Sequence, residues 1–175
     1  GEGFAVDASV IEADASRFAR IEGSQIDWTN EQQAQRPVRE YLKALDSAHS
    51  PTNPERKPKA LSPTDPTAAW TARGRNKVMF GYSLNYLIDM ENAVVVDVEA
   101  TPTRISKEVE ATETMIERTV NVFGIKPKCI AGDVAYGTGK LLGWLVRRGI
   151  EPHIPVWDKG KRDDGSLSRA DFAFN

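Results

Sequence analysis

The fold is decided by residues 128–156, which read KCIAGDVAYGTGKLLGWLVRRGIEPHIPV. A short apolar run ends at Asp133, a helical pattern extends over 138–148 and stops before Gly149, and a second extended run follows at 152–156. A strand, a helix and a strand in this order predict a crossover between two parallel strands, because the connection is long enough to contain the helix. This stretch therefore predicts an α/β fold.

The segments before this unit extend it to a mixed sheet. Residues 4–11 are apolar and β-branched and predict a strand, and residues 78–88 and 94–98 predict a β-hairpin. An apolar stripe at helical spacing predicts a helix that is capped by Ser106 and ends at Gly124. The stripe consists of Val109, Thr112, Ile116, Val120 and Phe123. The expected fold is a mixed sheet with helices packed on it.

Residues 12–70 predict an insertion after the first strand. They contain a short amphipathic helix around 37–46, where apolar residues recur at helical spacing. The stretch 50–66 is rich in proline, and each proline fixes φ and lacks an amide donor, so a loop is predicted there.

Composition is typical of a single globular domain and limits its functions. The chain has 175 residues, of which 40% are hydrophobic and 27% are charged. It has no apolar run near the roughly 20 residues that span a bilayer and no signal-peptide pattern, so a cytoplasmic location is expected. The net charge of −2 argues against a general nucleic-acid coat protein, whose affinity comes from Lys and Arg. A nuclease remains compatible, because it needs carboxylates at its centre and cations only around them.

Two carboxylates are placed where chemistry is expected. Asp7 and Asp133 lie in or at the end of strongly apolar strands, where an uncompensated charge would be expensive. Adjacent parallel strands bring their carboxyl ends together, and paired carboxylates there are suitable ligands for Mg²⁺, which prefers oxygen. Such a site suits phosphodiester chemistry. The alternative is that each aspartate only forms a turn or a cap.

The residues around both aspartates resemble the motifs of one protein family. Residues 4–16, FAVDASVIEADAS, resemble the first-aspartate strand of insertion-sequence transposases that use a DDE triad. Residues 130–137, IAGDVAYG, resemble their second-aspartate motif. Residues 62–66, SPTDP, and 80–89, FGYSLNYLID, resemble the linker and the hairpin of the same family. The four motifs occur in the family's order and cover nearly the whole chain.

The resemblance implies a ribonuclease H-like fold in which Asp7 and Asp133 are catalytic and hold Mg²⁺ or Mn²⁺ for DNA strand cleavage and transfer at insertion-sequence ends. It implies double-stranded DNA, both transposon ends and target, as the partner. It also implies a nucleoid-associated cytoplasmic location and a homo-oligomer for the full-length protein.

The third carboxylate of the triad has no counterpart in the chain. The family carries it as a glutamate on a later helix, so we expect it beyond Asn175 and interpret residues 1–175 as a partial catalytic domain that binds metal weakly and cuts DNA poorly or not at all. Asp171 is a rival third ligand, although its position after Ser168 also fits a capping box.

Further features leave alternatives open. Arg73, Arg75 and Lys77 form the basic cluster predicted to contact DNA phosphates, with a solvated face as the alternative. The glycine-rich stretch 132–140 lies where a phosphate-binding loop would lie, but it lacks the Walker A spacing, which disfavours a nucleotide-binding function. Two other functions remain: a catalytically inactive DNA-binding or oligomerisation remnant, and a ribonuclease H-like nuclease without transposition.

Overall fold

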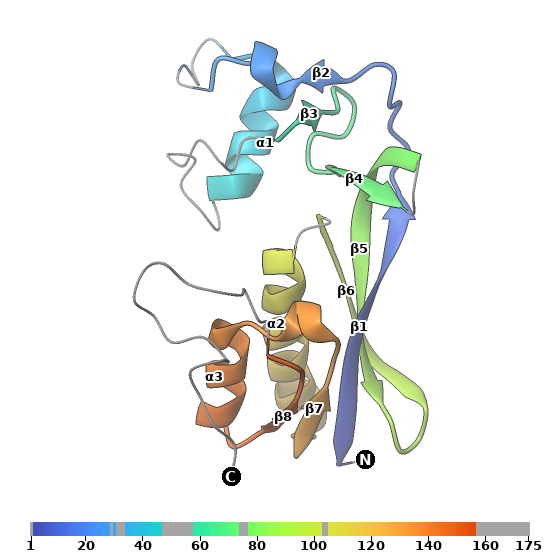
Figure 1. Ribbon diagram of the computed structural model, residues 1–175, viewed down its shortest axis with the longest axis vertical. Coiled ribbons are helices and arrows are strands. Elements are labelled where there is room, and N and C mark those ends of the chain that lie inside the picture. The colour runs from blue at the N-terminus through green and yellow to red at the C-terminus, as the bar shows by residue number, and fades with distance from the viewer. Residues whose placement is uncertain are drawn as a thin grey trace. The chain divides into compact units, whose positions relative to one another are not determined.

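The computed structural model describes most of the chain (Figure 1). The described residues are 2–28, 30, 34–46, 58–73, 77–102 and 105–156. They divide into two compact units. Unit 1 contains the described residues within 1–7, 86–97 and 112–175, and unit 2 contains those within 8–85 and 98–111.

A six-stranded mixed sheet is the main element of the described chain. The strands of the sheet are β1 Gly3–Glu12, β4 Ala69–Arg73, β5 Lys77–Asp89, β6 Val94–Pro102, β7 Cys129–Ala131 and β8 Glu151–His153. The helices that connect them are α2 Ile105–Phe123 and α3 Gly139–Arg147. The strand order is β4-β5-β1-β7-β8, and β6 pairs with β5. Strand β7 is parallel to both β1 and β8, whereas β4 is antiparallel to β5. The pairing confirms the predicted mixed sheet and the predicted hairpin.

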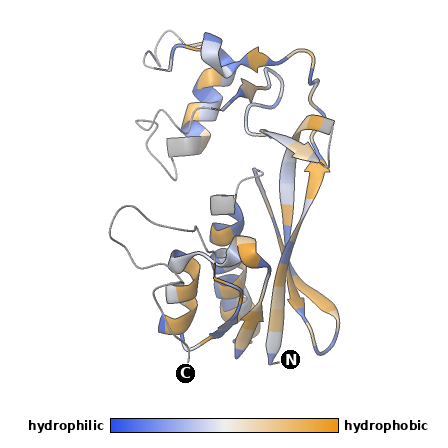
Figure 2. Cartoon of the chain, in the orientation of Figure 1, coloured by the Kyte–Doolittle hydropathy of each residue, from blue (hydrophilic) through white to orange (hydrophobic). Residues whose placement is uncertain are grey.

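Helix α3 connects β7 to β8 and confirms the predicted strand–helix–strand unit (Figure 1). Thr138 caps its first turn, because the hydroxyl oxygen accepts a hydrogen bond from the amide of Leu141 at 3.3 Å. Leu141 and Leu145 are buried. Figure 2 shows a mainly hydrophobic β7 and a mixture of hydrophobic and hydrophilic residues along α3. Helices α2 and α3 are followed by Gly124 and Gly149, both with positive φ, as predicted for terminators.

Helix α2 confirms the predicted helix with a correction at each end. It already includes Ile105, so Ser106 lies inside the helix and not at its N-cap. The predicted stripe is buried at Val109 and Ile116, but Phe123 is 58% exposed. Helical periodicity identifies an apolar face, and it does not determine how far along the helix other elements cover that face. No helix in the described part of the chain is long and apolar enough to cross a membrane.

Unit 2 contains a helix and two short strands in the region predicted as an insertion. Helix α1, Arg36–Asp46, confirms the predicted short helix. Strand β2, Ile21–Glu22, pairs with β3, Ala60–Leu61, and the 3-10 helix η1, Gly23–Gln25, follows β2. Val38, Tyr41 and Leu42 of α1 pack with Leu61 in one buried cluster. The proline-rich stretch therefore includes a strand that was predicted as loop, because two residues are too few to show a period.

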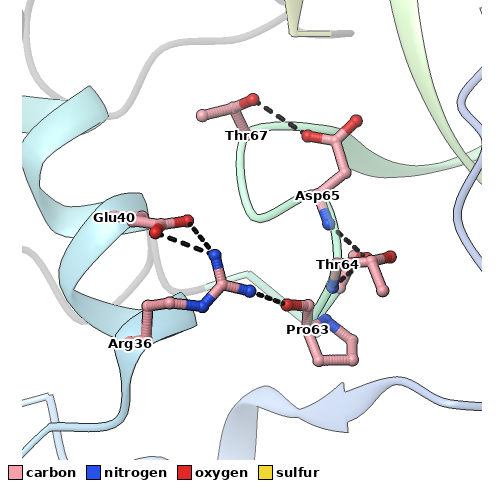
Figure 3. Close-up of polar contacts among 7 residues, drawn as sticks. Arg36, Glu40, Pro63, Thr64, Asp65 and Thr67 are labelled. Carbon is pink, nitrogen blue, oxygen red and sulfur yellow. Dashed lines mark hydrogen bonds and ion pairs between the residues drawn. The ribbon is translucent and has the colours of Figure 1, made fainter.

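The turn after β3 is attached to helix α1 by polar contacts (Figure 3). Arg36 forms an ion pair with Glu40 at 2.9 Å and donates a hydrogen bond to the carbonyl oxygen of Pro63 at 2.7 Å. The hydroxyl of Thr67 donates to the carboxylate of Asp65 at 3.1 Å. The described part of the proline-rich stretch is thus held by side chains as well as by its fixed φ angles.

Strand β4 is a correction to the predicted order of elements, in which a hairpin directly followed the insertion. Residues Ala69–Arg73 pair in antiparallel register with Lys77–Gly81 of β5. Alanine has a weak intrinsic preference for strands, so the local sequence gave little signal. Cross-strand pairing with β5 stabilises this strand.

Candidate metal centre and DNA contacts

Asp7 and Asp133 follow equivalent positions of two neighbouring parallel strands in unit 1. The pairing of β1 with β7 ends at Ala5 and Ala131, and each aspartate comes two residues after its alanine. Asp133 retains an extended backbone, with φ of −77° and ψ of 177°. Residues two apart in an extended chain point to the same face, so each aspartate is on the same face of its strand as the alanine two residues before it. Both residues are exposed.

Gly132 permits the close approach of the strands next to this pair. A Cβ atom added to Gly132 would lie 3.0 Å from Cγ2 of Val6 and 3.4 Å from Cδ2 of Tyr136. Val6 and Tyr136 are both buried, so neither has open space into which to move. The absence of a side chain before Asp133 therefore maintains the local spacing of the strands.

Asp133 also has a local structural role. Its Oδ1 atom accepts a hydrogen bond from the amide of Ala135 at 2.8 Å, which caps the 3-10 helix η3, Val134–Tyr136. The capping alternative considered from the sequence is therefore present. It does not compete with metal binding, because a carboxylate has two oxygen atoms with several acceptor positions, and this one is exposed.

The donors available at this position are carboxylate oxygens, which suits a hard divalent cation. Within the described residues, no group of three or more His, Cys, Asp or Glu side chains could hold a metal ion. Two protein carboxylates nevertheless fit Mg²⁺, which is commonly bound by one or two carboxylates together with water and phosphate oxygens. The rival third ligand, Asp171, lies outside the described residues.

Two residues of the basic cluster predicted to contact DNA are strand ends in unit 2, Arg73 of β4 and Lys77 of β5. Arg73 pairs with Lys77 at the end of the antiparallel ladder, and Arg75 lies outside the described residues. The backbones of Arg73 and Lys77 therefore occupy facing positions at the end of the ladder.

Two other acidic residues have structural partners. Asp97 accepts hydrogen bonds from Nε and Nη2 of Arg118 at 2.7 and 2.9 Å, a pair that sequence analysis missed because the partners lie on a strand and a helix. Asp89 accepts hydrogen bonds from the side chain of Asn92 at 2.8 Å and from the amides of Glu91 and Asn92. The Asn92 side chain and these amides hold the pKa of Asp89 well below its usual value. The hydrogen bonds to Asp89 have a sequence signal, which is the Asp-x-x-Asn spacing in a turn.

Comparison with known protein families identifies a match over nearly the whole chain. A family model described as the transposase DDE domain matches residues 2–172. Neither the curated proteins nor the solved structures include a significant match to the chain.

Proposed function

Because the chain belongs to the transposase DDE domain family, we propose that it performs metal-dependent cleavage and transfer of DNA strands at insertion-sequence ends. The family acts on DNA and generally uses a divalent metal. The chain has a mixed α/β fold with a mixed sheet flanked by helices, in accord with the ribonuclease H-like fold of DDE transposases.

Asp7 and Asp133 are the proposed ligands of Mg²⁺ or Mn²⁺. The observation that carries this assignment is the parallel register of β1 and β7, in which both aspartates follow the Ala5–Ala131 pair by two residues. A divalent cation bound there would stabilise the charge that develops on the phosphate and favour ionisation of the attacking oxygen. The contribution of the chain is to hold two carboxylates on paired strands, with Gly132 keeping the strands close.

The DNA contacts belong to the same proposal. Arg73, Arg75 and Lys77 are proposed to bind phosphates of the transposon end or the target, because Arg and Lys side chains commonly contact the phosphate oxygens of DNA. Residues 12–70 are then an insertion in the catalytic domain. Assembly of the full-length protein as a homo-oligomer and association with the nucleoid are further parts of the proposal, since two transposon ends and a target must be brought together.

Metal titration tests the assignment of the two aspartates. Calorimetry and thermal unfolding with MnCl₂ are expected to show binding to the wild-type chain that is weakened at least about tenfold in Asp7→Asn and Asp133→Asn, because each variant loses a charged ligand. Asp14→Asn is the matched control, since Asp14 is exposed and lies in unit 2. Equal binding by all four proteins would refute the metal centre.

Nicking of a supercoiled plasmid in the presence of Mn²⁺ separates the activities that the family permits. Strand transfer in addition to nicking supports the transposase proposal. Nicking without transfer, when insertion-sequence ends are supplied, favours a ribonuclease H-like nuclease. Metal binding without nicking is the result expected both for a catalytically inactive remnant and for a partial catalytic domain that cuts DNA poorly or not at all.

A further inference from the structure

We propose that the loop of residues 16–20 in unit 2 is a separate binding site for single-stranded DNA, with an unpaired base on the ring of Phe18 and a phosphate on Arg17. This inference rests on the proposed function in so far as DNA is the substrate. It uses neither the residues of the metal centre nor the basic cluster of Arg73, Arg75 and Lys77.

The side chain of Phe18 is unusually exposed. It is 80% exposed, the largest value among the exposed large hydrophobic side chains of the described residues. The guanidinium carbon of Arg17 lies 4.7 Å from the centroid of its ring, a cation–π contact at the surface. An accessible aromatic ring with an adjacent cation provides the two components of a single-strand binding site, stacking for a base and charge for a phosphate.

The loop is held in place by its own hydrogen bonds. The hydroxyl oxygen of Ser16 accepts from the amides of Phe18 at 3.2 Å and Ala19 at 3.4 Å. The guanidinium of Arg20 donates to the carbonyl oxygen of Arg17 at 3.0 Å. Because these contacts fix the backbone before a ligand arrives, binding at Phe18 would require little additional ordering of the loop.

Arg20 anchors the loop and leaves Arg17 as the cation for a ligand. Arg20 lies 5.3 Å from the centroid of the Trp70 ring on β4, and it forms an ion pair with Glu22 at 2.6 Å. Its charge is therefore balanced by a carboxylate. Arg17 forms no ion pair with any residue that the structure describes, so no described carboxylate balances its charge.

The acidic residues before the loop determine which DNA it fits. Glu12 and Asp14 precede Ser16 and are exposed, so the segment is not strongly basic and attracts phosphates only modestly. Stacking on Phe18 must then supply most of the affinity. A base can stack on a protein ring only when it is outside the duplex stack, which favours single strands over duplex.

Fluorescence anisotropy with a labelled single-stranded oligonucleotide, and with the same sequence as a duplex, tests the site. Phe18→Ala is expected to lower the single-strand affinity about tenfold, and Phe18→Trp is expected to retain it, because stacking on one ring has that magnitude. Arg17→Ala is expected to reduce the slope of log affinity against log salt by roughly one. Phe123→Ala and Arg147→Ala, which truncate exposed residues of the same types in unit 1, are expected to bind like the wild type.

Two outcomes would overturn the site. One is equal single-strand affinity for Phe18→Ala and the two control variants, and this result would leave the metal centre untouched because metal titration tests it independently. The other is a change in self-association of Phe18→Ala in sedimentation velocity with no change in DNA affinity, which would make the loop a protein interface.

Discussion

Gly132 and Val6 approach each other so closely that a Cβ atom added to the glycine would lie 3.0 Å from Cγ2 of the valine. Val6 directly precedes Asp7, and Gly132 directly precedes Asp133. The tight contact therefore lies next to both proposed metal ligands. A side chain at residue 132 requires buried neighbours to shift, and one of them, Val6, directly precedes a proposed metal ligand.

Gly132→Ala is expected to weaken Mn²⁺ binding roughly tenfold and to lower the free energy of unfolding by about 1–2 kcal/mol, because overpacking forces neighbouring atoms to shift. Calorimetric titration and urea unfolding measure the two effects. Gly139→Ala is the matched control, since a Cβ atom there meets nothing within 4 Å. Wild-type metal affinity in Gly132→Ala would show that the strand spacing does not control the site.

Arg118→Ala is expected to lower the free energy of unfolding by about 1–2 kcal/mol. This loss lies between the losses typical of breaking an exposed ion pair and of breaking a buried one. The reason is that the Asp97 side chain is only 16% exposed and loses a two-point partner when Arg118 is removed. Lys128→Ala provides the comparison, because Lys128 and its partner Glu2 are both 70% exposed and the pair should contribute less than about 1 kcal/mol. Equal effects in urea unfolding would mean that the contact to Asp97 contributes no more than a surface pair.

Asp89 is expected to make unfolding sensitive to acid. Hydrogen bonds from Asn92 and Glu91 hold the folded-state pKa of Asp89 below its usual value of 3.8. A lowered folded-state pKa adds stability that is complete above the unfolded value and is lost as the pH falls from there toward the folded value. The free energy of unfolding should therefore decrease below about pH 4.

Urea unfolding between neutral pH and pH 3 checks this dependence on Asp89. Asp89→Asn is expected to have a shallower decrease than the wild type over the acidic part of the range. Glu91→Gln removes a charge from the same turn and keeps its amide donor to Asp89, so it is expected to follow the wild type. If the free energy of unfolding of Asp89→Asn fell with pH as steeply as that of the wild type, the acid sensitivity would come from other carboxylates.

The sequence was sufficient for the elements that have a continuous apolar pattern, whereas the role of the two aspartates stays a prediction. Strand β1 was predicted because residues 4–11 are apolar and β-branched, and helix α3 was predicted because its apolar residues lie on one helical face. Asp7 and Asp133 were recognisable because each interrupts or ends an apolar run. Neighbouring parallel strands were expected for the two aspartates, and β1 does pair in parallel with β7. The register of that pairing has no local sequence signal, because it depends on contacts between strands that are far apart in the sequence.

Other features depend on contacts between distant residues and were missed for that reason. Strands β2 and β3 have two residues each, and only their mutual pairing defines them. The partner of Asp97 could not be identified, because Arg118 reaches it from helix α2. Phe123 is exposed because the described elements that pack on helix α2 do not extend over its last turn. The periodicity of the helix alone does not indicate where that packing ends.

The two roles of Asp133 can be separated by substitution. Asparagine keeps a side-chain oxygen that can accept from the amide of Ala135, whereas alanine keeps none. Asp133→Asn is therefore expected to unfold within about 0.5 kcal/mol of the wild type, and Asp133→Ala is expected to lose about 1 kcal/mol. Both variants should lose metal affinity, because neither has the negative charge.

Urea unfolding and Mn²⁺ titration of the same two variants decide between the roles. Equal stability of Asp133→Asn and Asp133→Ala would contradict the capping role. If Asp133→Asn instead bound Mn²⁺ as tightly as the wild type, the carboxylate charge would be unnecessary, and Asp133 would have only its cap of the 3-10 helix. Loss of metal affinity in both variants, with loss of stability in the alanine variant alone, is the result that follows if one oxygen holds the turn and the charge of the carboxylate binds the cation.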